Sequence, residues 1–307
     1  MDRRNFIKKS FQAGMVTSGA LSFGGFSDLF ASTNSLPNQS FDLTAIRGGE
    51  PDAMFDAAIK SLGGMKTFVK KGQKVVVKPN IGWDVSPERG GNTNPILVKR
   101  IIQHCFEAGA KDVYVFDNTC DNWKRCYSNS GIEQAVKDAG GKLVSGASEG
   151  YYQKVDVRNG KRLTSTTVHE LILDSDVFIN VPVLKHHSSA SITSAMKNLM
   201  GIVWDRGYWH RNDLHQCIAD FATFRKPDLN IVDAYYVMKK NGPRGVSKDD
   251  LITLKSQLIS KDIVAIDAAA VKLFGSEPES IKHIKIAHDM KVGNMNLDKL
   301  SINRIVI

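Results

Sequence analysis

The sequence predicts an α/β fold with a mostly parallel, doubly wound, Rossmann-like sheet, forming either one large domain or two lobes with a central cleft. Short apolar runs rich in β-branched residues recur along the chain and are typical of strands buried on both faces. Amphipathic helical patterns lie between them. With 307 residues, 42% of them hydrophobic, the chain is long enough for a large core.

The first residues have the order of an export signal. Arg3 and Arg4 precede a small-residue, apolar run at 11–26, and the paired arginines resemble the twin-arginine type. The run is too short and too rich in Gly and Ser for a stable membrane span. We therefore expect a signal peptide at 1–31, recognised by the twin-arginine export machinery, and a periplasmic or otherwise exported protein. An uncleaved anchor and a disordered basic tail are the alternatives.

The expected domain begins after a polar linker at 32–45 and extends over 46–307 as a single α/β unit. A helix at 51–62 starts with a proline in its first turn and ends at paired glycines. The run 75–77 is a buried strand that Pro79 terminates. Its carboxyl end therefore carries Lys78 and Asn80.

A polar, glycine-rich loop leads to Thr93 and Asn94, either of which is a natural cap for a helix at 96–108. Free backbone amides at such a start can hold a phosphate or carboxylate. The strand 113–116 follows and ends at Asp117. These pieces complete one strand–helix–strand unit.

The middle of the chain predicts a helix at 130–140, a weak strand at 143–144 and a polar hairpin within 145–170. The apolar run 171–181 then ends in a buried strand, beyond which we expect a basic loop and a helix that stops at Gly201. Ligands bind beyond the carboxyl ends of such strands. The polar residues there are Lys185, His186, His187, Lys197 and Asn198.

His210 and His215 invite a metal interpretation, but their spacing of five places them about 140° apart on a helix. An aromatic loop before a helix at 214–224 is the favoured interpretation. The short strand 230–232 again ends at an acid, Asp233.

The last part predicts a strand at 252–259, helices at 263–274 and 277–290, and a terminal strand at 302–307. Asp267 stands among apolar residues, so its carboxylate is either paired or turned to solvent.

The formal net charge of +9 favours anionic ligands. Basic residues are dispersed and are not interleaved with aromatics, so we expect no nucleic-acid partner. The four cysteines lack Cys-x-x-Cys spacing, although Cys120 and Cys126 are candidates for a pair in an oxidising compartment.

Several linked motifs resemble the family called domain of unknown function 362, from about residue 75 to 307. The motifs are VVVKPN, NTNP, VYVFDN, VFINVPVLKHH, MKNLMG, LNIVDA and SKDIVAIDAAAVKLFG. Similar proteins commonly have Lys-Thr-His where this chain has Lys185-His186-His187, so either histidine can take that place. Some members hold iron–sulfur clusters in cysteine motifs that this sequence lacks, so the resemblance implies no cluster here.

These residues predict an enzyme acting on a small anionic substrate in a Lys/His/Asp cleft, with a divalent metal as an open option. A non-catalytic periplasmic binding protein for an anionic ligand or cofactor is the alternative. The lysines would bind the anion, a histidine would act as general acid or base, and an aspartate would orient it. The candidate catalytic residues are Lys185, His186, His187, Asp117 and Asp233. The candidate substrate-binding residues are Lys78, Asn80, Thr93, Asn94, Lys197, Asn198 and Asp267.

Overall fold

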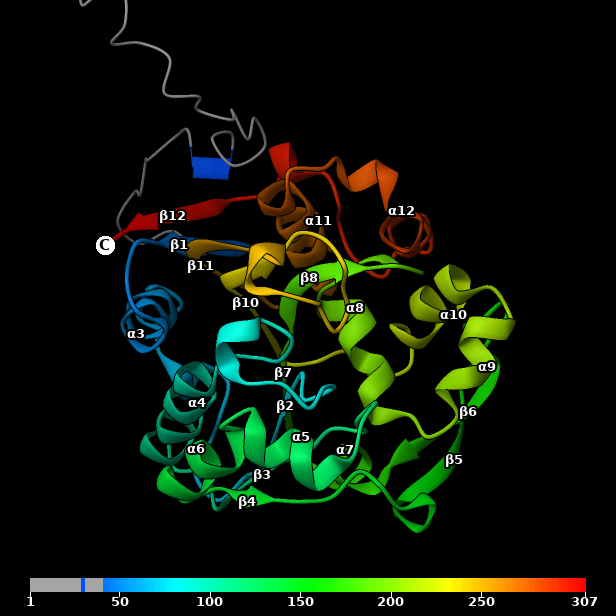
Figure 1. Cartoon of the computed structure of the whole chain (residues 1–307), viewed down its shortest axis with the longest axis horizontal. Coiled ribbons are helices and arrows are strands. Elements are labelled where there is room, and N and C mark those ends of the chain that lie inside the picture. The colour runs from blue at the N-terminus through cyan, green and yellow to red at the C-terminus, as the bar shows by residue number, and fades with distance from the viewer. Residues whose placement is uncertain (1–28, 31–40) are drawn as a thin grey trace, which may run out of the picture.

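The computed structural model describes residues 29–30 and 41–307, and Figure 1 shows their arrangement. The predicted signal peptide at 1–31 lies outside the described residues except for Leu29 and Phe30. The predicted linker at 32–45 lies outside them up to residue 40. Strand β1 (Leu43–Arg47) occupies the end of that linker, because Leu43 and Ala45 are fully buried in the sheet. The folded domain therefore starts before residue 46.

The centre of the molecule is a ten-stranded sheet with the order β12-β1-β11-β10-β7-β2-β3-β4, and β8 pairs with both β10 and β9. Antiparallel pairing is confined to β11, which lies between β1 and β10, and to the β8–β9 pair. The predicted α/β class with a mostly parallel sheet is confirmed. The remaining strands are β2 (Lys74–Pro79), β3 (Asp112–Val115), β4 (Lys142–Leu143), β7 (Val177–Val181), β8 (Val183–His187), β9 (Ser191–Thr193), β10 (Leu229–Met238), β11 (Leu251–Ser260) and β12 (Ile302–Val306).

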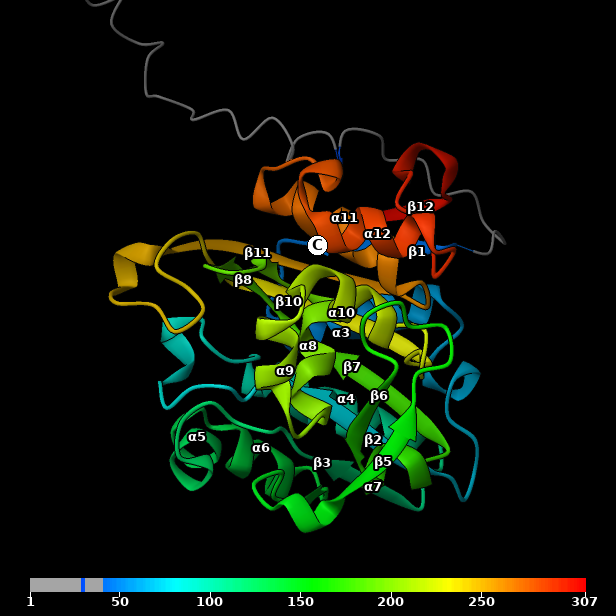
Figure 2. The same ribbon diagram turned by 90° about the vertical axis from the view of Figure 1, so that its right-hand side faces the viewer.

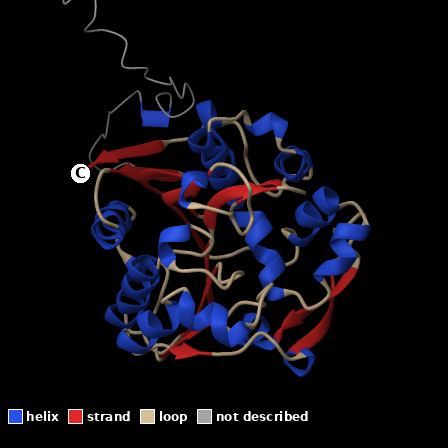
Figure 3. Ribbon diagram, in the orientation of Figure 1, coloured by secondary structure: helices blue, strands red, loops and turns tan. Residues whose placement is uncertain are grey.

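Helices cover both faces of the sheet (Figure 2 and Figure 3). Side chains alternate along each central strand, so that Val75 and Val77 pack into one core and Val76 into the other. One face carries α3 (Pro51–Ser61), α4 (Pro95–Glu107), α5 (Trp123–Asn129) and α6 (Ile132–Asp138). The other carries α7 (Glu170–Asp174), α8 (Ala195–Asn198), α9 (Arg206–Arg211), α10 (Leu214–Phe221), α11 (Ile263–Phe274) and α12 (Lys282–Asp289).

The largest departure from the sequence prediction lies just after β7. The expected basic loop is instead strand β8, which turns back through β9 before a helix of only four residues. This is possible because β10 runs on to Met238 and offers β8 a partner beyond the end of β7. Asp233 had suggested an earlier end to that strand. The backbone amides of Asn94 and Tyr235 donate to its carboxylate, so the strand continues through it.

Smaller differences concern the middle of the chain. The predicted hairpin is present as β5 (Tyr152–Asp156) and β6 (Ser165–His169). Helix α5 was not predicted, and neither was α7, which occupies the start of the apolar run 171–181. The strand at the end of this run is confirmed as β7, which begins at Val177 after Ser175 adopts an extended backbone and ends α7.

Candidate functional site

A cleft with a volume of about 360 Å³ opens at the carboxyl ends of β2, β3 and β8, beside α8. The carboxyl ends of neighbouring parallel strands lie close together there, as in other open α/β sheets. Seven of the residues predicted from the sequence line it: Lys78, Asn80, Asp117, Lys185, His187, Lys197 and Asn198. The other five lie behind it or beside it.

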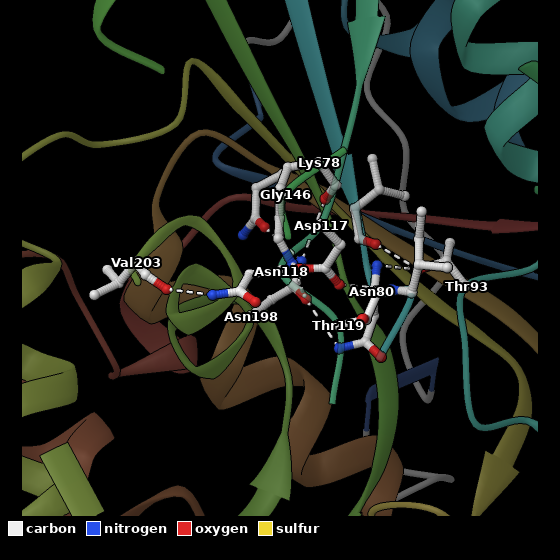
Figure 4. Close-up of polar contacts among 12 residues, drawn as sticks. Lys78, Asn80, Thr93, Asp117, Asn118, Thr119, Gly146, Asn198 and Val203 are labelled. Carbon is white, nitrogen blue, oxygen red and sulfur yellow. Dashed lines mark hydrogen bonds and ion pairs between the residues drawn. The ribbon is translucent and has the colours of Figure 1, made fainter. Parts of the chain in front are cut away.

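A buried ion pair forms the floor of the cleft. The Lys78 ammonium lies 2.9 Å from Asp117 Oδ1 and also donates to Asn198 Oδ1 over 2.9 Å. Asn80 Nδ2 donates to the same Asn198 oxygen, and the backbone amide of Ile81 donates to Asp117 Oδ2. Figure 4 shows these side chains turned toward one another from separate segments. Burial lowers the pKa of Lys78, and the Asp117 carboxylate opposes that shift.

Gly201 passes directly against this ion pair. A Cβ at this position would overlap Asp117 Oδ1 and approach Lys78 Nζ to 2.5 Å. The Gly201 carbonyl also accepts from the backbone amide of Asn118 over 2.9 Å. The end of the MKNLMG motif is therefore glycine because the backbone must come this close to the pair.

Lys185 is held in place by two acceptors. Its ammonium donates to Asn80 Oδ1 over 3.1 Å and to the Gly91 carbonyl over 2.5 Å. The side chain is buried, and burial lowers the pKa of Lys185 to about 7, with the positive charge of Lys197 adding to the effect. This lysine changes its charge near neutral pH.

Lys197 also lines the cleft but has no hydrogen bond or ion pair with any residue that the structure describes. Burial, together with the positive charges of Arg206 and Lys78, lowers the pKa of Lys197 to about 8. Its segment is fixed from behind, because Asp267 accepts hydrogen bonds from the backbone amides of Ala195 and Met196. Asp267 is thus buried in the core and does not reach the cleft.

The two adjacent histidines have different surroundings. His187 Nδ1 accepts from the backbone amides of Ser189 and Ala190, so its proton is on Nε2. Burial lowers the pKa of His187 to about 2, with Lys197 next in effect, so it is a neutral donor. His186 is outside the cleft lining, and its Nδ1 accepts from the Gly242 amide over 3.1 Å.

Three predicted site residues support the cleft from behind. Thr93 donates to the Val181 carbonyl and accepts from the Asn80 amide. Asn94 caps α4 through its side chain, as expected for a residue before Pro95. Asp233 is buried, and burial raises its pKa to about 6. These residues position the loop that carries Asn80.

The structure adds residues that the sequence analysis did not select. Arg206 donates to the carbonyls of Asn118 and Thr119 at 2.6 and 2.8 Å, which joins α9 to the end of β3. Asn118 and Cys120 lie one and three residues after Asp117, at the same strand end, and could have been selected on that ground. No sequence signal marks Arg206, and the sequence suggested His210 only for a metal pair with His215, because the packing of α9 is what brings both Arg206 and His210 here. The additional lining residues are Gly82, Trp83, Asn118, Cys120, Ser188, Thr193, Met200, Gly201, Arg206, His210 and Pro243.

Comparison with known proteins agrees with the motifs. Residues 75–272 match the family described as domain of unknown function (DUF362). The chain belongs to the DUF362 family. A thylakoid-associated protein of the cyanobacterium Synechocystis sp. is 27% identical over 258 residues, which covers 81% of this chain and 76% of that protein.

Two solved structures resemble this DUF362 chain more distantly. The lactate racemase apoprotein from Thermoanaerobacterium thermosaccharolyticum has a TM-score of 0.45 and 11% identity, covering 83% of this chain and 58% of that one. A protein from Thermotoga maritima has a TM-score of 0.45 and 10% identity, covering 78% and 60%. The chain spans about three fifths of the length of these two structures.

In its described part, this DUF362 protein has unpaired cysteines and no cluster of metal ligands. All four cysteines are free thiols, with Cys120 exposed in the cleft and Cys126 buried beneath it. Across residues 29–30 and 41–307, no three His, Cys, Asp or Glu side chains gather as a metal-binding group. No helix in the same ranges has the length and apolar character needed to cross a bilayer.

Proposed function

We propose that this protein is an exported enzyme that binds a small phosphate- or carboxylate-bearing substrate in the cleft described above. The observation that carries the proposal is the imbalance of charge. Lys78, Lys185, Lys197 and Arg206 line the cleft, and Asp117 is the only carboxylate among the described residues that line it. With Lys78 paired to Asp117, up to three positive charges remain for a ligand.

Neutral donors complete an anion site. The Nε2–H of His187 and the side-chain amides of Asn80 and Asn118 belong to the lining. Lysine supplies point charges with rotatable donors, and amides add directional hydrogen bonds. A carboxylate or phosphate group would therefore find both charge and hydrogen bonds here.

Lys185 is the group best suited to proton transfer. A general acid or base works best when its pKa lies near the operating pH, and the pKa of Lys185 is about 7. The predicted histidine base is less favourable, because the pKa of His187, lowered to about 2 by burial, makes it a very weak base whose Nδ1 already accepts two backbone hydrogen bonds, and because His186 is outside the lining. We therefore assign the acid–base role to Lys185.

A non-catalytic binding protein is the second candidate. The fixed tautomer and low pKa of His187 favour a binding protein, because His187 then supplies the cleft with a hydrogen-bond donor and not with a general base. Turnover separates the two candidates. The chain would be incubated with carboxylated and phosphorylated metabolites and the products followed by mass spectrometry.

The binding step is tested by calorimetry with phosphate and lactate. We expect Lys185→Met and Lys197→Met each to weaken binding by about tenfold or more, because each removes a desolvated charge. Lys66→Met changes an exposed lysine outside the cleft and is the matched control. Equal affinities in all four proteins would refute an anion site at this position.

Export is tested separately. Arg3 and Arg4 would be replaced by lysines in the native host, and the protein followed by fractionation. Accumulation inside the cell after this substitution supports the twin-arginine route. Unchanged distribution would contradict it.

A further inference from the structure

The three cleft lysines differ in how they are engaged. Lys78 is committed to Asp117 and Asn198, and Lys185 donates to Asn80 and the Gly91 carbonyl. Lys197 has no such partner among the described residues and is not completely buried. Its nitrogen is the one whose lone pair, once free of a proton, is available to a molecule in the cleft.

The surroundings of Lys197 suit a neutral amine. Its charge helps to lower the pKa of both His187 and His210, so all three groups lie near one another. The two imidazole rings are stacked with centroids 6.4 Å apart. Close positive neighbours and burial make protonation of Lys197 costly, which is how proteins activate lysine as a nucleophile.

We propose that Lys197 is a covalent site, forming an imine with an aldehyde or ketone that also carries a carboxylate or phosphate. This inference rests on the proposed anion-binding function and names its substrate class. Lys185 and Arg206 line the same cleft and would hold the anionic group, which leaves the carbonyl carbon to Lys197. A carbonyl group also explains why an anion site would contain an amine without a partner.

The step balances without an oxidant or reductant. The lone pair of Lys197 Nζ attacks the carbonyl carbon, and the carbon–oxygen π electrons move to oxygen, which takes up a proton. The carbinolamine then loses its hydroxyl as water, and the carbon–nitrogen double bond forms as the nitrogen gives up its protons. His210 can accept a proton on one ring nitrogen and donate one from the other, which moves protons from nitrogen to oxygen.

Reductive trapping tests the proposal. The full chain would be incubated with pyruvate or with dihydroxyacetone phosphate and sodium cyanoborohydride at about pH 8, and the adducts mapped by peptide mass spectrometry. At that pH about half of an amine with a pKa of about 8 is neutral, against about one in 250 of an ordinary lysine. We therefore expect Lys197 to be labelled at least about tenfold more than exposed Lys66, and Lys197→Arg to abolish that label.

Lactate and glycerol 3-phosphate separate this inference from the proposed function, because they carry the same anions without a carbonyl. If they bind but neither carbonyl compound labels Lys197, the imine is refuted and the anion site stands. If the label appears on Lys185 or spreads over exposed lysines, the assignment to Lys197 is wrong. If none of the four compounds binds, both proposals fail. Labelling by pyruvate alone or by dihydroxyacetone phosphate alone supports the imine and identifies the anionic group.

Discussion

At the scale of single residues, Gly201 has the most direct effect on the geometry of the cleft. A methyl group there would overlap the Lys78–Asp117 pair. We expect Gly201→Ala to destabilise the protein by about 1–3 kcal/mol and to abolish anion binding, since overpacking displaces the pair. Urea unfolding and calorimetry measure the two effects. Gly150→Ala is the control, because its Cβ meets only a side-chain oxygen at 3.7 Å. A Gly201→Ala protein with normal stability would contradict the close approach.

The affinity for an anion should depend on the charge of Lys185 and Lys197. The pKa of each is lowered, to about 7 and about 8, so both are charged below these values and lose charge as the pH rises through them. We expect lactate, which stays ionised, to bind best below about pH 7 and to lose affinity by about pH 9. Calorimetry across this range measures the loss. An affinity that is constant to pH 9 would contradict the lowered pKa values.

Many of the individual site residues could be predicted because they are polar residues at the ends of apolar strands. Lys78, Asp117 and Lys185 were selected because each follows or ends an apolar run, and they do meet. Asp233 satisfied the same rule, yet its side chain caps backbone amides behind the cleft. Sequence position gives the end of a strand, but the hydrogen bonds that a carboxylate finds decide whether it faces a ligand.

At the scale of elements, helices α10 and α12 meet through two histidines. His215 Nδ1 lies 3.1 Å from His283 Nδ1, and Nε2 of the buried His283 has no hydrogen-bond partner among the described residues. Burial lowers the pKa of His283 to about 3, with His215 next in effect. Protonation therefore favours the unfolded chain, in which histidine has its ordinary pKa of about 6.5.

This pair predicts sensitivity to acid. A histidine with a lowered pKa costs stability as the pH falls from about 6.5 to about 3, because the unfolded state binds the proton more readily. We expect His283→Leu to reduce the loss of stability between pH 7 and pH 4 by a few kcal/mol. Urea unfolding at both pH values measures it, with His288→Leu on the same helix for comparison. Identical pH dependence in wild type and His283→Leu would exclude this pair as the cause.

The elements also show where sequence patterns stop being sufficient. The strands β2, β3 and β7 contain apolar runs with clear ends and were predicted, and so was the more polar β11. Strand β8 was not, because it carries Lys185 and His187, and a strand with such residues forms only when β10 extends to receive it. Likewise the four-residue α8 depends on Asp267, which lies far along the chain. These elements are set by tertiary partners and have weak local signals.

At the scale of the whole molecule, the segment between β10 and β11 joins the cleft to the chain that follows β3. Pro243 lines the cleft, and the Arg244 guanidinium lies 3.6 Å from the carboxylate of Asp121. Because Arg244→Ala removes the ion pair that holds this segment, we expect it to speed both association and dissociation of the anion. The free energy of unfolding should change by less than about 0.5 kcal/mol, because exposed ion pairs contribute little to stability. Stopped-flow binding measures this, with exposed Lys248→Ala in the same segment as control. Unchanged rates would show that the segment does not limit entry.

The long separation along the chain between groups in the cleft has a consequence for folding. Lys78 and Asn198, which share two hydrogen bonds, are 120 residues apart, and the lining extends to Pro243. No early folding intermediate with only local contacts can contain the site, since loops of this length close late. Anion binding would therefore appear only when the central sheet is complete. A ligand added during refolding would therefore stabilise the native protein and leave the folding intermediates unaffected.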